Sequence, residues 1–280
     1  MAYNKYYLQK KQVSYDNGLT WEDVTPSETR QGAYIDSYET LAECDGGQHD
    51  YSQDYLTFES KTDNNTIYWK VGGQLQAKTI SASTDNGNTW TAYAATTGGT
   101  IIATLNAGDK ILLKGENSAY SISSQQNSFS SSGQFEAYGN IMSLVSGDTF
   151  ENVTEVAPFA FQGLFNGCSG LTSAENLILP ATTLASSCYN IMFYNCANLT
   201  TAPELPAATL TEYCYGGMFV GCTSLNYVKC LATDISANSC TIAWLHNVAA
   251  NGTFVKDASM SSWTTGVSGI PSGWTVIDNS

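Results

Sequence analysis

A sequence frame that returns at a nearly fixed interval dominates the C-terminal half of this 280-residue chain. The segments LFNGCSGL (164–171), MFYNCANL (192–199) and MFVGCTSL (218–225) carry an aromatic residue, a cysteine and a leucine at fixed offsets. Successive copies start 28 and then 26 residues apart. A period of about 20–30 residues is typical of solenoids, in which each unit buries its apolar side only against its neighbours. The recurring residues are Phe165, Cys168, Leu171, Phe193, Cys196, Leu199, Phe219, Cys222 and Leu225.

A second set of residues repeats in step with the first. LPATTLASSCY (179–189) and LPAATLTEYCY (205–215) are near copies, and LATDISANSC (231–240) is an eroded third copy. Their cysteines are Cys188, Cys214 and Cys240. Two ladders of three cysteines cannot pair completely, so we predict free thiols that pack as small apolar side chains. Because no C-x-x-C motif occurs, we also predict no metal site.

The combined frame resembles the BspA-like leucine-rich repeat family over about residues 150–250. The resemblance implies a short parallel β-ladder on one side and short helical turns, such as SSCYNIMFYNC (186–196), on the other. The segment LTTAPELP (199–206) contains few β-branched residues, so we expect an extended segment in place of a full strand. Solenoids need atypical end units. We assign the caps to 149–165, which also reads as an imperfect first unit, and to 252–278.

Residues 54–140 do not show this repeat. Seven short runs rich in β-branched and aromatic residues alternate there with turn signals. This pattern predicts an antiparallel β-sandwich. The run SISSQQNSFSSSG (121–133) has little to bury and is expected to be a loop. The predicted fold class is mainly β, with an N-terminal β-hairpin region, a sandwich and a capped short-helix solenoid. The predicted domains are 1–50, 54–140 and 141–280, with a linker at 45–54.

Two further segments, SYDNGLTW (14–21) and STDNGNTW (83–90), fit the pattern S-x-D-x-G-x-T-W. They resemble the Asp-box, a hairpin best known from sialidases and other glycan-handling propellers. In such a hairpin the aspartate accepts hydrogen bonds from turn amides, the Asn-Gly pair adopts positive φ, and the tryptophan covers the apolar base. Each residue therefore has a structural role. The residues concerned are Asp16, Gly18, Trp21, Asp85, Gly87 and Trp90.

The composition argues against catalysis. A sialidase holds its substrate carboxylate with clustered arginines, and this chain contains only Arg30, which lysine cannot replace as a bidentate donor. The 25 acidic residues always offer some pair of carboxylates, so a pair does not by itself indicate a glycosidase. Neither histidine, His49 or His246, lies in a nucleophile-elbow sequence. We predict no enzyme activity and no cofactor; a carbohydrate-active enzyme is the least favoured alternative.

The charge pattern excludes other classes of partner. The formal net charge is −14 and no basic stripe exists, which excludes nucleic-acid binding. No run approaches the roughly 20 apolar residues of a membrane span. Asp45, His49, Asp50 and Asp54 lack the ligand grid of a calcium loop, so a solvated loop is expected. Charged residues are 13% of the chain, about half the usual share, and the uncharged polar surface that results is typical of fibres and adhesins.

With these classes excluded, we predict a function in binding through a surface. The candidate contact residues are Tyr194, Tyr213 and Tyr227, since tyrosine suits glycan or protein contact. The N-terminal sequence reads without a secretory leader, although a removed leader is left open. We therefore expect a phage virion protein, such as a tail fibre, head fibre or decoration protein, that binds a host cell surface or glycans. Residues 1–50 would attach it to other virion proteins, and a homotrimer is one expected assembly. The alternative is a BspA-like adhesin on a bacterial cell surface.

Overall fold

The computed structural model describes residues 11–14, 22–24, 33–34, 49–73, 76–122, 125–261 and 263–279. The chain divides into two compact units, Met1–Asp50 and Tyr51–Ser280. In the first unit, β1 (Lys11–Ser14) pairs antiparallel with β2 (Glu22–Val24) and with β3 (Ala33–Tyr34). Strands β1 and β2 thus flank the first Asp-box-like segment. Its residues Asp16, Gly18 and Trp21 lie outside the described residues.

The predicted linker at 45–54 is wrong for its last residues, which belong to the second unit. The short 3-10 helix η1 (Tyr51–Gln53) packs against β12 (Phe135–Asn140). The Tyr51 ring lies 5.2 Å from that of Tyr138, and the Asn140 side-chain amide donates a 3.0 Å hydrogen bond to the Ser52 carbonyl. These contacts fix the start of the second unit.

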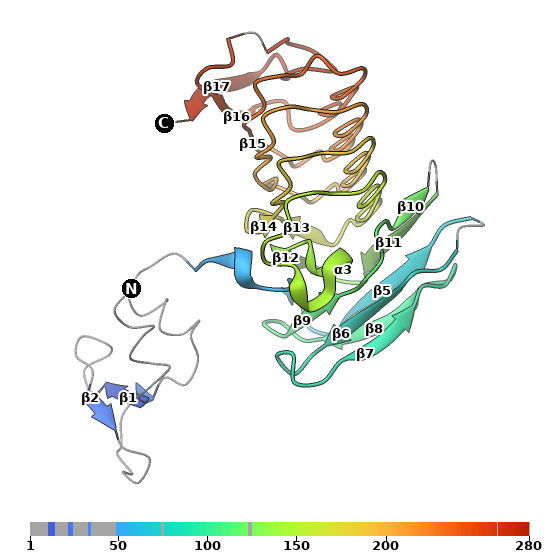
Figure 1. Ribbon diagram of the computed structural model, residues 1–280, viewed down its shortest axis with the longest axis vertical. Helices are drawn as coiled ribbons and strands as arrows, with labels where there is room; N and C mark the ends of the chain where they lie inside the picture. The colour runs from blue at the N-terminus through green and yellow to red at the C-terminus, as the bar shows by residue number, and fades with distance from the viewer. Residues whose placement is uncertain are drawn as a thin grey trace. The chain divides into compact units, whose positions relative to one another are not determined.

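Two open sheets form the first part of the second unit (Figure 1). One has four strands in the order β10-β11-β5-β8. The other has seven, in which β12, β4, β9, β6 and β7 pair antiparallel and two short strands, β13 and β14, pair parallel with β12. The bounds are β4 (Leu56–Ser60), β5 (Asn65–Val71), β6 (Thr79–Ser83), β7 (Thr91–Ala94), β8 (Thr100–Leu105), β9 (Lys110–Lys114), β10 (Ser121–Ile122), β11 (Gln125–Ser131), β13 (Leu171–Ser173) and β14 (Leu177–Ile178).

All seven predicted strands between residues 54 and 140 are confirmed, but the predicted loop at 121–133 is wrong. That segment forms β10 and β11, because Asn127 and Phe129 supply the buried face that its small polar residues lack. The Asn127 amide is satisfied there, since it donates to the Tyr120 carbonyl at 3.1 Å and accepts from the Lys78 N–H at 3.1 Å. Two inward side chains at the strand period were enough to form a core strand.

Aromatic side chains join the two sheets to the rest of the unit. The Phe58 ring of β4 lies 4.9 Å from that of Phe129 in β11 and 5.8 Å from that of Phe165. One continuous cluster of buried residues runs from Leu56 to Trp274. The segments 54–140 and 141–280, predicted as two domains, therefore share a hydrophobic core within one compact unit.

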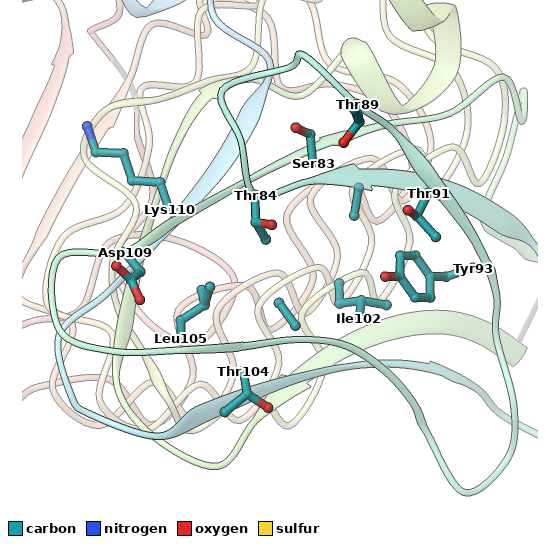
Figure 2. Close-up of a pocket in the computed structure, with 12 residues that line it drawn as sticks. Ser83, Thr84, Thr89, Thr91, Tyr93, Ile102, Thr104, Leu105, Asp109 and Lys110 are labelled. Carbon is teal, nitrogen blue, oxygen red and sulfur yellow. The ribbon is translucent and has the colours of Figure 1, made fainter.

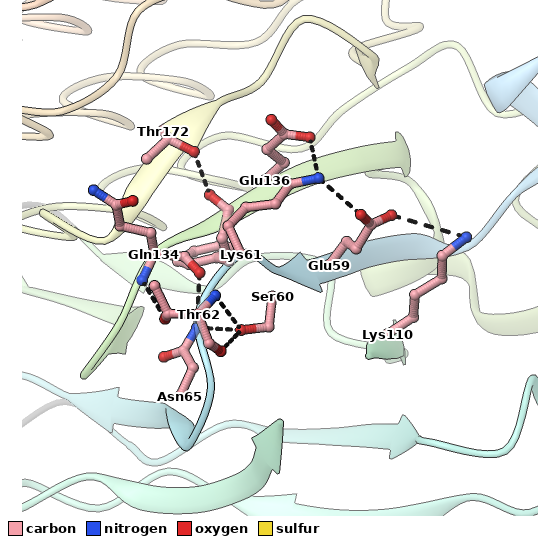
Figure 3. A network of polar contacts seen from close by, with 10 residues as sticks. Glu59, Ser60, Lys61, Thr62, Asn65, Lys110, Gln134, Glu136 and Thr172 are labelled. Atoms are coloured by element: carbon pink, nitrogen blue, oxygen red, sulfur yellow. Dashed lines mark hydrogen bonds and ion pairs between the residues drawn. The ribbon is translucent and has the colours of Figure 1, made fainter. Parts of the chain in front are cut away.

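A polar network ties the hairpin between β4 and β5 to β12 (Figure 3). The buried Asn65 amide donates to the Ser60 hydroxyl and to the Gln134 carbonyl, each at 3.1 Å, and its carbonyl oxygen accepts from the Gly133 N–H at 2.8 Å. Lys61 pairs with Glu136 at 2.9 Å. The bonds of Asn65 satisfy a buried polar side chain, whereas the pair between Lys61 and Glu136 is exposed.

The second part of the unit is a stack of coils (Figure 1), each of which contains a series of tight turns. In the coil that holds 187–195, the N–H groups of alternate residues donate to carbonyls of the next coil, and those in between donate three residues back. The same alternation occurs at 159–167 and 213–221, whereas the series at 239–247 accepts bonds from the preceding coil and donates to backbone carbonyls only three residues back. In the first three series about half of the amides thus hold neighbouring coils together.

The predicted helical turns at 186–196 are wrong for this reason. An α-helix uses its amides within the helix, four residues back, and leaves none for a neighbouring coil. In addition, φ is positive at every fourth residue of the series, at Ser187 (57°), Ile191 (48°) and Asn195 (58°), which a right-handed helix does not allow. Among the described residues the only α-helix is α3 (Ser143–Ser146), followed by the 3-10 helix η2 (Gly147–Thr149). The described residues include no helix that is long and apolar enough to cross a bilayer.

Parallel pairing continues on another side of the coils. Strands β15 (Tyr227–Cys230), β16 (Gly252–Asp257) and β17 (Trp274–Asn279) form a three-stranded parallel sheet. The segment 199–206 contributes only isolated bridges, at Thr201 and Leu205, which confirms the prediction that it is extended without forming a full strand.

Two columns of aromatic rings run through the stack. The rings of Phe165, Phe193 and Phe219 are 5.3 and 5.4 Å apart and within 4° of parallel. The second column contains Phe161, Tyr189, Tyr215, Trp244 and Trp263, with spacings of 5.7, 6.1, 6.4 and 5.5 Å. The structure therefore brings the repeated phenylalanines together. The repeated leucines, Leu171, Leu199 and Leu225, are fully buried as well.

The two ends of the stack are covered differently. Residues 149–165, predicted both as a first unit and as a cap, contribute Phe161 and Phe165 to the columns, and the sheets cover this end. The Phe129 N–H of β11 donates to the Leu164 carbonyl at 2.8 Å. At the far end, within the predicted cap 252–278, Trp263 stacks on Trp244 and the Trp274 indole donates to the Ala249 carbonyl at 2.8 Å.

The seven cysteines of the described residues are free and buried: Cys168, Cys188, Cys196, Cys214, Cys222, Cys230 and Cys240. Three of them connect coils, because Cys196 Sγ donates to the Phe165 carbonyl and Cys222 Sγ to the Phe193 carbonyl, each at 3.0 Å, and Cys214 Sγ to the Cys240 carbonyl at 3.9 Å. Burial raises the pKa of Cys168 and Cys188 to about 12. Such thiols stay protonated at neutral pH and react slowly.

Replacing Tyr189 with phenylalanine is expected to raise the free energy of unfolding by about 1 kcal/mol, because its buried hydroxyl has no hydrogen-bond partner among the described residues. Phenylalanine already occupies the preceding rung, at Phe161. The matched control is Tyr120→Phe, which removes a hydroxyl that donates to the Leu144 carbonyl at 2.5 Å and should lower stability. Urea denaturation followed by circular dichroism measures both, and equal shifts in the same direction would contradict the expectation.

Candidate functional site

The second Asp-box-like hairpin connects β6 to β7 and is held from within by Asp85. The carboxylate accepts the Ser83 hydroxyl at 2.6 Å, the Thr89 N–H at 2.9 Å and the Thr89 hydroxyl at 2.6 Å. Asn86 and Gly87 adopt φ of 56° and 83°, which confirms the predicted positive values. The hairpin therefore has one fixed loop conformation.

The same bonds lower the pKa of Asp85 and give a test by pH. Hydrogen bonds from Ser83 and Thr89 lower the pKa of Asp85 from 3.8 to about 2. A depressed carboxyl pKa stabilises the folded hairpin above the ordinary pKa, and this contribution is lost as the pH falls through the lowered value. We expect the Asp85 carboxyl carbon to titrate near pH 2 in NMR spectra, with the Thr89 amide shifting alongside. Asp85→Asn should abolish that step, and an ordinary titration near 3.8 would contradict the assignment.

Trp90 lies beside Gly87 of the turn. Its ring also covers the ammonium group of Lys114, which lies 4.2 Å from the ring centroid, and packs 5.0 Å from the Tyr55 ring. Lys114 and the Tyr55 hydroxyl both bond to Asp148 at 2.7 Å. Burial, and then the hydrogen bond to Asp148, raise the pKa of Tyr55 to about 12. The tryptophan thus joins the hairpin to η2 through a charged cluster.

A cleft of about 470 Å³ opens beside the same hairpin, between β6 and β7 of one sheet and β8 of the other (Figure 2). We call it the hydroxyl-lined cleft. Its volume falls within the range of about 300–1,000 Å³ that small-molecule sites occupy. Its lining consists of Ala82, Ser83, Thr84, Thr89, Thr91, Tyr93, Ile102, Ala103, Thr104, Leu105, Asp109 and Lys110.

The floor and the rim of the cleft differ in chemistry. Three buried aliphatic side chains, Ala82, Ile102 and Leu105, form an apolar floor. The rim carries hydroxyl groups, among them those of exposed Thr91 and half-buried Tyr93. Polar groups make up most of the accessible lining of the cleft.

The rim hydroxyls divide into fixed and available ones. Those of Ser83 and Thr89 are held by Asp85. Within the described residues, no hydrogen bond from the side chains of Thr84, Thr91 or Tyr93 to another group is present, so their hydroxyls can serve a ligand. The cleft therefore offers donors and acceptors on a wall that the aspartate keeps in place.

Two charged residues border the cleft, but only one of them presents its charge there. Lys110 extends away from the other lining residues (Figure 2), and its ammonium lies 5.6 Å from the Tyr138 ring centroid and 3.9 Å from Glu59. Asp109 is exposed, and one of its oxygens accepts the Asn106 N–H at 2.8 Å. The fixed charge at the cleft is therefore negative.

A second cavity, of about 400 Å³, lies near Trp90 and is lined in part by Lys114, Glu116, Asn117 and Asp148. Its ammonium and one of its carboxylates already form the ion pair between Lys114 and Asp148. The Asn117 amide donates to the Thr79 carbonyl at 2.8 Å. Lys114, Asp148 and Asn117 of this cavity are therefore already bonded to other groups of the protein.

The structure does not gather the predicted tyrosines into one patch. Tyr194 and Tyr213 belong to the turn series of two coils, whereas Tyr227 lies in β15. The residues of the hydroxyl-lined cleft were missed, because β8 follows β7 in the sequence but pairs in the other sheet, so no local pattern places it beside the hairpin. The available signal was the segment NTWTAYA (88–94), whose strand period places Thr91 and Tyr93 on one face.

In the described part of the chain, no group of three or more His, Cys, Asp or Glu side chains is placed to hold a metal ion. His246 is exposed on the last turn series, and His49 lies just before η1. No protein-family model, curated protein or solved structure matches the chain. The chemistry of the hydroxyl-lined cleft is thus the basis for assigning a function.

Proposed function

We propose that this chain is a non-enzymatic structural protein that binds glycans of a cell surface. The supporting observation is the hydroxyl-lined cleft, whose apolar floor of Ala82, Ile102 and Leu105 lies below a hydroxyl-bearing rim. A sugar ring has the complementary chemistry, with C–H groups on its faces and hydroxyls around its edge. Hydroxyl and tyrosine side chains are also adaptable contacts in other binding surfaces.

The architecture fits a display scaffold. We propose that the two sheets form a β-sandwich and that the coils form a BspA-like leucine-rich repeat solenoid built on its edge. The period of the repeat, the stacked rings of Phe165, Phe193 and Phe219, and the parallel bridges support this proposal. A scaffold with one continuous core holds a cleft in a fixed shape.

The setting that we propose is a phage virion, in which the protein is a fibre or decoration protein and the unit Met1–Asp50 attaches to other virion proteins. The low share of charged residues, 13%, and the polar uncharged surface support it. Co-purification of the chain with phage particles is the expected result, and mass photometry of the isolated protein tests the predicted homotrimer. Recovery in a bacterial envelope fraction would favour the alternative, a surface adhesin.

A glycan array with the labelled full chain tests the binding function. We expect retention of a defined subset of glycans, with no release of reducing sugar from those glycans in solution. Absence of retention on a broad array would overturn the proposal. Release of reducing sugar that a single carboxylate substitution abolishes would instead show a carbohydrate-active enzyme.

A further inference from the structure

We propose that the hydroxyl-lined cleft binds an uncharged sugar unit and rejects glycans that carry sialic acid or sulfate at that unit. This inference rests on the proposed glycan-binding function and names the class of glycan. Three features of the cleft carry it: its floor, its rim and its charge.

The floor sets how a sugar ring lies. Ile102 and Leu105 of β8 and Ala82 of β6 lie at the base of the cleft, and although each is no more than 5% exposed, the small surface that they present is aliphatic. A hydroxyl or carboxylate pressed onto this surface would lose its water without gaining a partner, which costs free energy. The face of a pyranose ring, made of C–H groups, is the part of a glycan that fits there.

The rim sets the hydrogen bonding. Thr84, Thr91 and Tyr93 carry hydroxyls with no partner among the described residues, and each can donate and accept. The half-buried Tyr93 ring adds an apolar surface beside the floor. Such groups match neutral hydroxyls, whereas an anionic substituent would find donors without positive charge.

The charge sets what is rejected. Asp109 lies at the cleft and Lys110 is turned toward Glu59 and Tyr138, so no ammonium compensates a bound anion. The whole chain carries a formal net charge of −14, which adds a repulsive potential toward anionic ligands. An uncharged sugar meets neither penalty.

The hairpin is ordered before a ligand arrives. Asp85 accepts three hydrogen bonds from Ser83 and Thr89, so the wall that carries Thr84 does not have to be ordered on binding. Preorganisation of this kind lowers the entropic cost of association. We therefore assign Asp85 as a positioning residue of the cleft.

The test uses the full chain and an array of neutral oligosaccharides, each printed beside its sialylated or sulfated derivative, with lactose and 3′-sialyllactose as one such pair. We expect binding to the neutral members and little change between low and high salt, since no ion pair contributes. Tyr93→Ala should weaken that binding by about tenfold or more, as expected for loss of an aromatic contact. Tyr194→Ala, which alters a tyrosine of the coil stack, is the matched control and should leave binding unchanged.

Asp109→Asn separates charge from shape, because asparagine keeps an oxygen that can accept the Asn106 N–H. We expect the variant to retain neutral glycans and to gain affinity for their anionic partners. Preferential retention of anionic glycans by the unsubstituted protein would overturn the inference and leave the glycan-binding function standing. Neutral binding that Tyr194→Ala abolishes and Tyr93→Ala does not would place the site on the coils and also overturn it. No retention of any glycan would contradict the proposed function itself.

Discussion

Replacing Phe193 with alanine is expected to lower the free energy of unfolding by about 3–5 kcal/mol. Phe193 is fully buried, and its ring lies 5.3 Å from that of Phe165 and 5.4 Å from that of Phe219. The substitution leaves a cavity at the centre of a column. Backbone hydrogen bonds between the coils fix their spacing, so the coils cannot move together to fill the cavity. Urea denaturation of the second unit, followed by circular dichroism, measures the loss.

Cys196→Ala in the same coil is the matched control. It removes one small buried side chain and the hydrogen bond from its Sγ to the Phe165 carbonyl, so a loss of about 1 kcal/mol is expected. If Phe193→Ala lowered the free energy of unfolding no more than Cys196→Ala does, the repeat would not define a packed column.

Replacing Trp244 with alanine should cost a similar amount, about 3–5 kcal/mol. Its ring is stacked between those of Tyr215 and Trp263, at 6.4 and 5.5 Å, and its indole donates to the Gly269 carbonyl at 2.9 Å. Because a coil is stabilised only by its neighbours, we expect the loss to fall first on the terminal coil. Hydrogen exchange should show reduced protection over 252–279.

Trp90→Ala provides the comparison for that experiment. Trp90 is partly exposed and covers Lys114, a contact of about 0.5–1 kcal/mol at such a site. It should leave protection of 252–279 intact. Equal protection of that segment in both variants would contradict the assignment of Trp263 and Trp244 as the end of the column.

Much of this fold could be predicted from the periodicity of apolar residues. The strand period placed β4 to β9 and β12, and the repeat placed Phe165, Phe193 and Phe219 at equivalent positions. Both signals are local and depend only on which side of the backbone is buried. Both signals can therefore be recognised in the sequence without knowledge of tertiary contacts.

The failures have physical causes. Residues 121–133 form strands because Phe129 meets Phe58 and Trp69 from elsewhere in the chain, a contact that no local pattern reports. Helical turns at 186–196 were expected from the family resemblance, but alternate amides there bond to the next coil, and Ile191 adopts a positive φ. In both segments tertiary contacts decide the structure.

The hydroxyl-lined cleft was beyond sequence reasoning because two sheets form it. Thr91 and Tyr93 come from β7, whereas Ile102 and Leu105 come from β8 in the other sheet. The direction of Lys110, which decides the charge of the cleft, depends on contacts with Glu59 and Tyr138. By contrast, the role of Asp85 as the centre of a turn followed from the hairpin motif alone.

Amide chemical-shift mapping of the full chain tests the proposed binding site most directly. The probe is the neutral oligosaccharide that the array retains best, titrated into labelled protein. We expect the largest shifts in β7, in β8 and in the loop that Asp85 holds, and no response in the turn series of the coils. Shifts confined to the coil stack, around Tyr194 and Tyr213, or no saturable shift at all, would contradict this expectation.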